Sequence, residues 1–197
     1  MSQGVENSGS DLASGLRTVV LVGLMGAGKT TAGRRLAKRL GRAFVDSDSE
    51  VEKAAGCSVD DIFSFHGEAV FRDVERRVIF RLLEGDPVIL ATGGGAFMDA
   101  EIRRKIAGRA TTVWLRADLE ILLERVSRRD TRPLLRGDDA RAVLARLIDQ
   151  RYPVYAQADI IVDTGNGSHN RVVETILKKL AATGVAPGTT AAQGAPG

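Results

Sequence analysis

The chain has 197 residues, of which 44% are hydrophobic and 27% are charged, and its formal net charge is +3. These values suit one domain with a sizeable core. No apolar run approaches the roughly 20 residues that a membrane-spanning helix needs, and the N-terminus lacks the basic and apolar segments of a signal peptide. We therefore expect a cytoplasmic protein without a membrane partner.

Basic and acidic residues interleave along most of the chain, and arginine supplies most of the 28 basic residues. A nucleic-acid-binding surface typically shows a basic cluster or stripe, so we predict no nucleic-acid partner. The one cysteine, Cys57, cannot form an intrachain disulfide. No conspicuous apolar stripe is left over from the predicted core, and we therefore expect a monomer.

The two ends of the chain contain few large apolar residues, which predicts disordered tails at 1–16 and 184–197 on a single domain at 17–183. Inside the domain, short β-branched runs alternate with longer amphipathic runs. Strands are predicted at 18–22, 43–45, 87–91, 111–115 and 159–162. Helices are predicted at 28–40, 48–55, 58–65, 67–84, 99–107, 118–128, 139–151 and 169–182.

This alternation predicts an α/β fold, a doubly wound parallel sheet of five strands with right-handed crossovers. The strands are almost continuously apolar, as expected for strands that are covered by helices on both faces. Ligands of such folds bind at the carboxyl ends of the strands.

The first strand runs directly into "GLMGAGKTT", residues 23–31, which fits the phosphate-binding pattern G-x-x-x-x-G-K-[ST]. Glycines allow a tight turn whose N–H groups point at phosphate oxygens, and the next helix adds its N-terminal dipole. Lys29 would reach the β- and γ-phosphates, and the Thr30 hydroxyl would ligate Mg²⁺. The segment predicts nucleoside triphosphate binding by Gly26, Ala27, Gly28, Lys29, Thr30 and Thr31.

Two aspartates, Asp46 and Asp48, follow the second predicted strand in "AFVDSDSEVE". Side chains two residues apart in an extended chain share a face, so the two carboxylates would repel each other. A bound ligand that offsets this repulsion would explain why they lie together. We predict that Asp46 supports Mg²⁺ through water in the coordination shell, and that Asp48 accepts a hydrogen bond from an attacking hydroxyl. The competing interpretation is that Asp48 only caps the following helix.

Three glycines, Gly93, Gly94 and Gly95, follow the third strand in "ATGGGAF". Without side chains, the backbone is open to close approach by another group. We predict that a substrate lies against their N–H groups, with a plain loop as the alternative.

Three arginines have settings that differ from the rest. Arg72 precedes Glu75 by three residues on one helix face. Arg132 lies in "RRDTRPLLRGDD", a polar loop at about 129–138 that is typical of a mobile lid and could bring positive charge to a transferring phosphoryl group. Arg151 ends a predicted helix just before Pro153. Each could be a surface residue, and together they indicate a small anionic substrate.

These segments, taken in order, resemble the shikimate kinases. The resemblance covers about residues 17–182 and rests on "GLMGAGKTT", "FVDSD", "IFSFHGEAVFRDVE", "ATGGGAF", "RPLL" and "RYPVY". It implies a P-loop NTPase fold with a helical substrate-binding region and a lid. It also implies transfer of the ATP γ-phosphate to the 3-hydroxyl of shikimate, in the pathway to chorismate and the aromatic amino acids, with Mg²⁺ as cofactor.

On the substrate side, the resemblance implies that Asp48 binds the shikimate hydroxyls. Arg72 and Arg151 would hold the carboxylate, with a contribution from Gly94. Two aromatic residues, Phe63 and Phe71, match positions that line the shikimate pocket.

On the nucleotide side, the resemblance implies that Arg132 meets the ATP phosphates from the lid and that Arg125 stacks on adenine. The catalytic residues would then be Lys29, Asp48 and Arg132. Family members often carry an arginine in the loop after the last strand, whereas this chain has "TGNGSHN" there. We assign no function to His169 in that segment.

Two other function classes stay open from the sequence. The same phosphate-binding loop would serve another small-molecule kinase, such as a gluconate kinase. It would also serve an ATP-binding regulatory switch. A GTPase is disfavoured, because no asparagine of the chain precedes a lysine as the guanine-reading N-K-x-D segment requires.

Overall fold

The structure is a computed structural model that describes residues 17–128, 139–165 and 167–183. The predicted tails at 1–16 and 184–197 lie outside the described residues. So does the predicted lid at 129–138, and with it Arg132.

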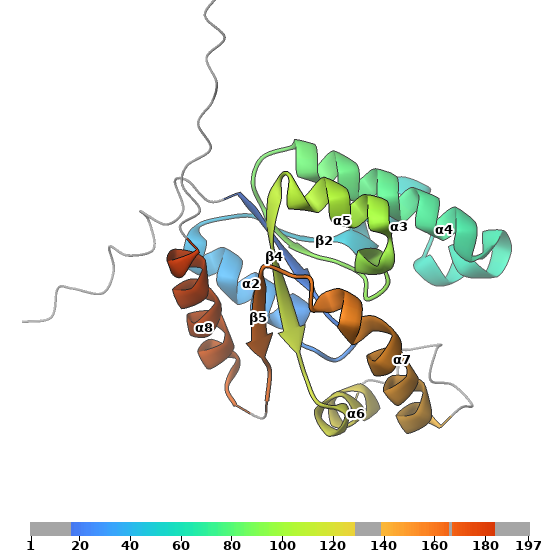
Figure 1. The fold of residues 1–197 in the computed structure, drawn as a ribbon. Coiled ribbons are helices and arrows are strands. Elements are labelled where there is room, and N and C mark those ends of the chain that lie inside the picture. The colour runs from blue at the N-terminus through green and yellow to red at the C-terminus, as the bar shows by residue number, and fades with distance from the viewer. Residues whose placement is uncertain (1–16, 129–138, 166, 184–197) are drawn as a thin grey trace, which may run out of the picture.

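A five-stranded sheet runs through the centre of the domain in the order β2-β3-β1-β4-β5, with every neighbouring pair parallel (Figure 1). The β1 residues, "TVVLV", are all buried because helices cover both faces of the sheet. The predicted fold class is therefore confirmed. The strands are β1 (Thr18–Val22), β2 (Phe44–Asp46), β3 (Ile89–Ala91), β4 (Ala110–Arg116) and β5 (Ile160–Asp163).

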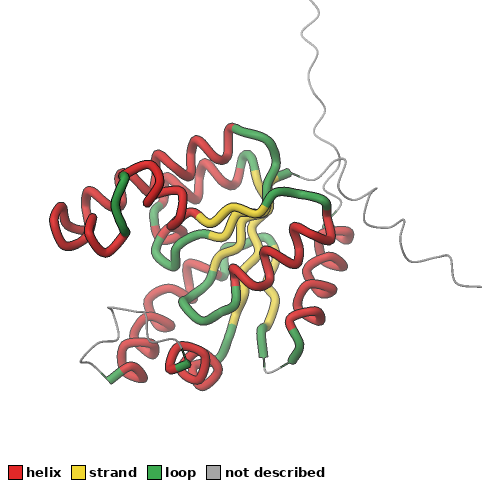
Figure 2. The backbone as a smooth tube through the Cα atoms, turned by 180° about the vertical axis from the view of Figure 1, so that it is seen from behind, coloured by secondary structure: helices red, strands yellow, loops and turns green. Residues whose placement is uncertain are grey.

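Helices pack on both sides of this sheet (Figure 2). Two of them, α2 and α8, lie side by side, and Arg35 of α2 donates a hydrogen bond of 2.7 Å to Asn170 of α8. The helices are α2 (Lys29–Leu40), α3 (Ser47–Ala55), α4 (Val59–Glu84), α5 (Ala100–Ala107), α6 (Leu119–Ser127), α7 (Ala140–Tyr155) and α8 (His169–Ala182), with a short 3₁₀ helix η1 (Ala96–Met98). In the part of the chain that the structure describes, no helix has the length and apolar character needed to cross a membrane.

Several predicted helix starts carry the expected caps. Ser58 and Asp61 form a reciprocal capping box at the start of α4, and the Asp99 side chain accepts hydrogen bonds from backbone N–H groups of α5. Helix α4 joins the two helices predicted at 58–65 and 67–84. They meet at Gly67, whose φ of 81° and ψ of 171° are non-helical and readily adopted only by glycine.

The predicted end of α7 at Arg151 is wrong, because the helix continues through Pro153 to Tyr155. Proline has no N–H, so the helix loses one hydrogen bond there. Aromatic packing offsets this loss: the rings of Tyr152 and Tyr155 lie 4.9 and 5.9 Å from the Trp114 ring, centroid to centroid. The extra turn places Tyr155 one turn beyond Arg151.

Helices α3 and α4 share a small apolar cluster of their own, separate from the main core. It consists of Val51, Ile62, Phe71 and Val78. This cluster stabilises a helical region next to the end of β2, which is where the fold places the predicted substrate side.

Candidate functional site

One cavity of about 600 Å³ opens beside the phosphate-binding loop and the glycine turn, where β1, β2 and β3 end. Most of the predicted site residues line it, although they come from separate parts of the sequence. They are Gly26, Gly28, Lys29, Thr30, Thr31, Asp46, Asp48, Phe63, Phe71, Arg72, Gly93, Gly94, Gly95, Arg125 and Arg151. Ala27 faces the core, where it is 1% exposed.

The phosphate-binding loop has the shape that its glycines allow. Gly23, Gly26 and Gly28 have φ values of 144°, 79° and 94°, which L side chains rarely adopt. The Lys29 ammonium donates to the carbonyls of Gly23 at 2.8 Å and Leu24 at 3.0 Å, so it lies over the loop. The loop ends at the N-terminus of α2, a position suited to binding an anion.

Asp46 contacts both the loop and the next helix. One of its carboxylate oxygens accepts a hydrogen bond of 3.3 Å from the Thr30 hydroxyl, and the other accepts one of 3.2 Å from the Asp48 backbone N–H. Asp46 is therefore the N-cap of α3.

This arrangement corrects two parts of the sequence argument. The strand ends at Asp46, and Asp48 lies in the first turn of α3, so strand alternation is not what brings the two carboxylates together. The capping role considered for Asp48 belongs to Asp46. Both side chains still line the cavity.

The oxygens of Thr30 and Asp46 fit a magnesium ion in kind, because Mg²⁺ prefers hydroxyl, carboxylate and phosphate oxygens. Among the described residues, no three His, Cys, Asp or Glu side chains gather as a metal site. The pair resembles a P-loop magnesium site, where the protein supplies one or two oxygens and nucleotide and water supply the others.

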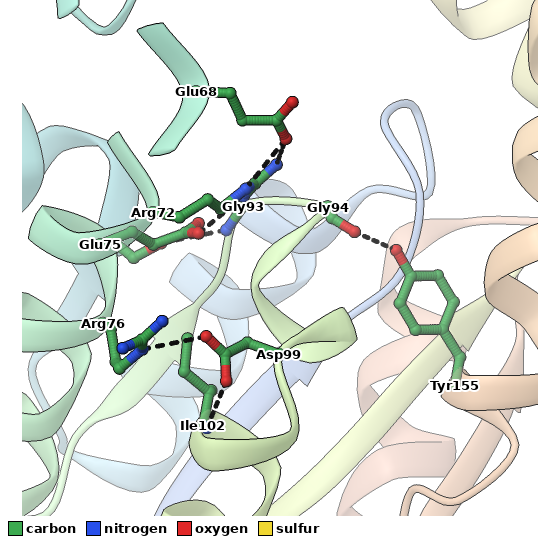
Figure 3. A network of polar contacts seen from close by, with 10 residues as sticks. Glu68, Arg72, Glu75, Arg76, Gly93, Gly94, Asp99, Ile102 and Tyr155 are labelled. Atoms are coloured by element: carbon green, nitrogen blue, oxygen red, sulfur yellow. Dashed lines mark hydrogen bonds and ion pairs between the residues drawn. The ribbon is translucent and has the colours of Figure 1, made fainter. Parts of the chain in front are cut away.

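Arg72 is held by two glutamates of its own helix (Figure 3). Its guanidinium donates to Glu75 at 2.6 Å and to Glu68 at 3.2 Å, as the spacing of Arg72 and Glu75 predicted. Burial acts to lower the pKa of Arg72, but these two carboxylates outweigh it and the pKa is raised. Arg72 is therefore a fixed, charged group at the cavity.

Glu75 is a buried residue that sequence analysis used only as a partner of Arg72. Its side chain is 1% exposed, and burial raises its pKa although Arg72 opposes the shift. Within the described residues, its Oε1 atom has no hydrogen-bond partner. It lines the same cavity as Asp48 and adds to the negative potential there.

The glycine turn lies against these charged side chains. A Cβ atom on Gly93 would be 2.7 Å from Asp48 Oδ1, and one on Gly95 would be 2.4 Å from Arg72 Nη2. The Gly93 N–H donates to the Ser47 hydroxyl at 3.0 Å. The missing side chains thus allow Asp48 and Arg72 to approach the backbone, a reason that the sequence alone did not reveal.

Two aromatic rings and a second guanidinium complete the predicted substrate side. Phe63 and Phe71 are in contact, with ring centroids 4.6 Å apart, and the Arg72 guanidinium lies 5.0 Å from the Phe71 ring. Arg151 approaches from α7, and its Nη1 atom would be 3.2 Å from a Cβ on Gly94.

At the other end of the cavity, Arg125 connects the phosphate-binding loop with the loop after β5. It donates to the Gly26 carbonyl at 3.3 Å and to the Gly165 carbonyl at 2.7 Å. Burial lowers its pKa.

His169, the first residue of α8, also lines the cavity, and sequence analysis missed it. Burial, with Arg35 and Arg125 nearby, lowers its pKa and favours the neutral imidazole. The signal that could have found it is its place in the segment after the last strand, where members of the resembling family often carry an arginine.

Comparisons with known proteins agree with this geometry. The family model described as shikimate kinase matches residues 25–181. The shikimate kinase of Paramagnetospirillum magneticum is 57% identical over 164 residues, which are 83% of this chain and 84% of that protein. The shikimate kinase of Caulobacter vibrioides is 56% identical, over 83% of this chain and 82% of that protein.

Solved structures give the same result. The structure of shikimate kinase from Acinetobacter baumannii in complex with shikimate has a TM-score of 0.83 and 37% identity, covering 88% of this chain and 97% of that one. A gluconokinase from Sinorhizobium meliloti, with a TM-score of 0.56 and 17% identity over 86% of this chain and 93% of that one, shares the fold alone. With a family model that spans the domain and relatives above half identity, the chain belongs to the shikimate kinase family.

Proposed function

We propose that this protein transfers the γ-phosphoryl group of ATP to the 3-hydroxyl of shikimate and releases shikimate 3-phosphate and ADP. The observation that carries the proposal is one shared cavity of about 600 Å³. A phosphate-binding loop lines one part of it, and two arginines with an aspartate line another. Membership of the shikimate kinase family supports the assignment of the acceptor.

The nucleotide half is built from the loop and Arg125. The N–H groups of residues 26–31 would bind the phosphates, and Lys29 would move from the Gly23 and Leu24 carbonyls to the β- and γ-phosphates. Arg125 would pack on the adenine, with His169 as a second contact from α8. Arg132 is kept as a proposed phosphate contact, and it lies outside the described residues.

Thr30 and Asp46 would hold Mg²⁺, the aspartate through a coordinated water. The ion, when bound, neutralises charge on the phosphates. The hydrogen bond between the two side chains places a hydroxyl and a carboxylate next to the loop, where the β- and γ-phosphates would lie. Asp46 is further fixed by its capping bond from Asp48.

The acceptor half provides complementary groups for a carboxylate and for ring hydroxyls. Arg72 and Arg151 would bind the carboxylate, since guanidinium groups recognise carboxylates through paired hydrogen bonds. The turn at Gly94 would place its peptide groups against the substrate. Phe63 and Phe71 would pack on the apolar face of the ring.

Asp48 would accept a hydrogen bond from the 3-hydroxyl and orient its oxygen toward the γ-phosphorus. Phosphoryl transfer depends mainly on positioning and charge stabilisation, so this orientation is the main contribution of the carboxylate. When the hydroxyl oxygen attacks, Asp48 would take its proton. Lys29 and the lid arginine would stabilise charge on the transferring group.

We also propose a cytoplasmic monomer, since ATP and the acceptor are both small soluble molecules that one chain can bind. Light scattering coupled to size-exclusion chromatography tests the monomer. A mass near 21 kDa is expected, and one near twice that value would contradict it.

A coupled ADP-release assay with shikimate, with gluconate and without acceptor tests the function. Shikimate-dependent release is expected, with the other two reactions at background. Equal release in all three would indicate an ATPase or a switch, and gluconate-dependent release would indicate a gluconate kinase.

A further inference from the structure

Tyr155, the last residue of α7, is fully buried, yet its hydroxyl reaches the glycine turn that lines the cavity. It donates a hydrogen bond to the carbonyl oxygen of Gly94 (Figure 3). Burial raises the pKa of this phenol to about 12, so the hydroxyl keeps its proton and remains a donor at neutral pH. The bond joins the end of α7 to the glycine turn.

The Gly94 carbonyl accepts its hydrogen bond from a different kind of donor than the carbonyls of Gly93 and Gly95 do. The Gly93 carbonyl accepts from the Ala96 N–H at 3.2 Å, and the Gly95 carbonyl accepts from the Met98 N–H at 3.0 Å. Those bonds are local and fix the shape of the turn. The bond from Tyr155 comes from another element, so it fixes the position of the turn relative to α7.

The same phenol also contacts Arg151, which precedes it by four residues and therefore lies on the same face of α7. The nearby Arg151 guanidinium acts to lower the pKa of Tyr155, against the effect of burial. The Arg151 Nη1 atom would be 3.2 Å from a Cβ on Gly94. The phenolic hydroxyl thus donates to the turn and lies near the guanidinium, which itself lies close to Gly94.

We propose that Tyr155 is a positioning residue that holds the Arg151 guanidinium and the Gly94 peptide group at a fixed separation. This inference rests on the proposed function, because it takes the shikimate carboxylate as the ligand of Arg151. Among the described residues, Arg151 and Gly94 line the cavity and Tyr155 does not. Tyr155 therefore acts on shikimate through these two groups.

Tyr152 provides a matched comparison on the same helix. Its hydroxyl also donates to a backbone carbonyl, that of Ala117, and its ring also packs against Trp114. The Ala117 carbonyl belongs to the segment after β4 and not to the glycine turn. Removing either hydroxyl costs a similar hydrogen bond, but only one of the two bonds reaches the substrate side.

The test compares Tyr155→Phe with Tyr152→Phe in steady-state kinetics, with circular dichroism to verify folding. For Tyr155→Phe we expect the KM for shikimate to rise about five- to tenfold, the equivalent of one hydrogen bond, with the KM for ATP within about twofold. For Tyr152→Phe both KM values should stay within about twofold of the wild type. If Tyr155→Phe does not fold, 4-fluorophenylalanine at position 155 fills the space of the hydroxyl without donating.

A double-mutant cycle separates positioning from a general loss of stability. In an Arg151→Ala background, Tyr155→Phe should change the KM for shikimate clearly less than in the wild type, because one of the two groups that it positions is gone. An undiminished effect in that background, or equal effects of Tyr155→Phe on both substrates, would overturn the inference. The inference would also be overturned if Tyr155→Phe and Tyr152→Phe had the same kinetics while the wild type phosphorylates shikimate. A wild type that does not phosphorylate shikimate would instead contradict the proposed function.

Discussion

The nucleotide and acceptor halves that we propose for the cavity are built in different ways. The nucleotide half comes mainly from one continuous segment, residues 23–31, whose glycine conformations direct backbone groups inward. The acceptor half comes from side chains of α3, α4 and α7 and from the glycine turn, brought together by the fold. Most substitutions leave the backbone N–H groups in place, whereas a site made of side chains loses a binding group with each substitution.

The acceptor half also holds its charges by mutual contact. Arg72 is paired with Glu75 and Glu68, while Asp48 and Glu75 lie next to Gly93. We therefore expect single substitutions there to change shikimate kinetics and leave ATP binding largely intact. The following predictions test this separation, from the largest expected effect to the smallest.

Asp48→Asn should lower kcat by about a hundred- to a thousandfold, because an amide accepts the substrate's hydrogen bond poorly and cannot take its proton. The KM for ATP should stay near the wild-type value, measured by coupled assay. Asp60→Asn, an exposed change in the first turn of α4, is the control. Near-normal turnover of Asp48→Asn would remove this residue from the chemistry.

Arg72→Ala should raise the KM for shikimate about a hundredfold, since a charge-assisted pair of hydrogen bonds to the carboxylate is lost. ATP binding, measured by calorimetry, should change little. Arg77→Ala is the matched control on α4, because Arg77 is 78% exposed and pairs only at the surface with Asp73. A comparable loss for both ligands would indicate a folding defect.

Gly93→Ala should raise the KM for shikimate about tenfold, because the new methyl group would displace Asp48 and Glu75. Gly108→Ala is the control: Gly108 has a negative φ, and a Cβ there would meet no atom within 4 Å among the described residues. Equal kinetics for both variants would show that the turn tolerates a side chain and that its fit is loose.

His169→Ala should raise the KM for ATP about threefold and leave the KM for shikimate unchanged, the opposite of the acceptor-side variants. The pKa of His169 is lowered, so the imidazole is neutral above its ordinary pKa and its contribution should be constant between pH 7 and 9. His66→Ala, on the exposed part of α4, is the control. An unchanged KM for ATP would remove His169 from the nucleotide half.

The contrast between a continuous segment and side chains assembled by the fold also explains which features the sequence could predict. Strand periodicity and the loop motif are local, so all five strands, the sheet type and the phosphate-binding loop were predictable. The pairing of Arg72 with Glu75 was predictable too, because it follows from helical spacing.

The features that depend on tertiary contacts were not predictable. The end of α7 was misplaced because Pro153 signals a helix end locally, whereas packing on Trp114 decides it. The capping role of Asp46, the position of Asp48 in a helix and the charged neighbours of the glycine turn also arise only in the folded chain. His169 was missed because the sequence places no partner near it at metal-ligand spacing.

A crystal structure with ADP, Mg²⁺ and shikimate tests the central claim most directly. We expect phosphate oxygens on the N–H groups of residues 26–31, the shikimate carboxylate within about 3 Å of Arg72 and Arg151, and a ring hydroxyl on Asp48. Shikimate bound elsewhere, or separated from Asp48 by more than one bridging water, would contradict the account.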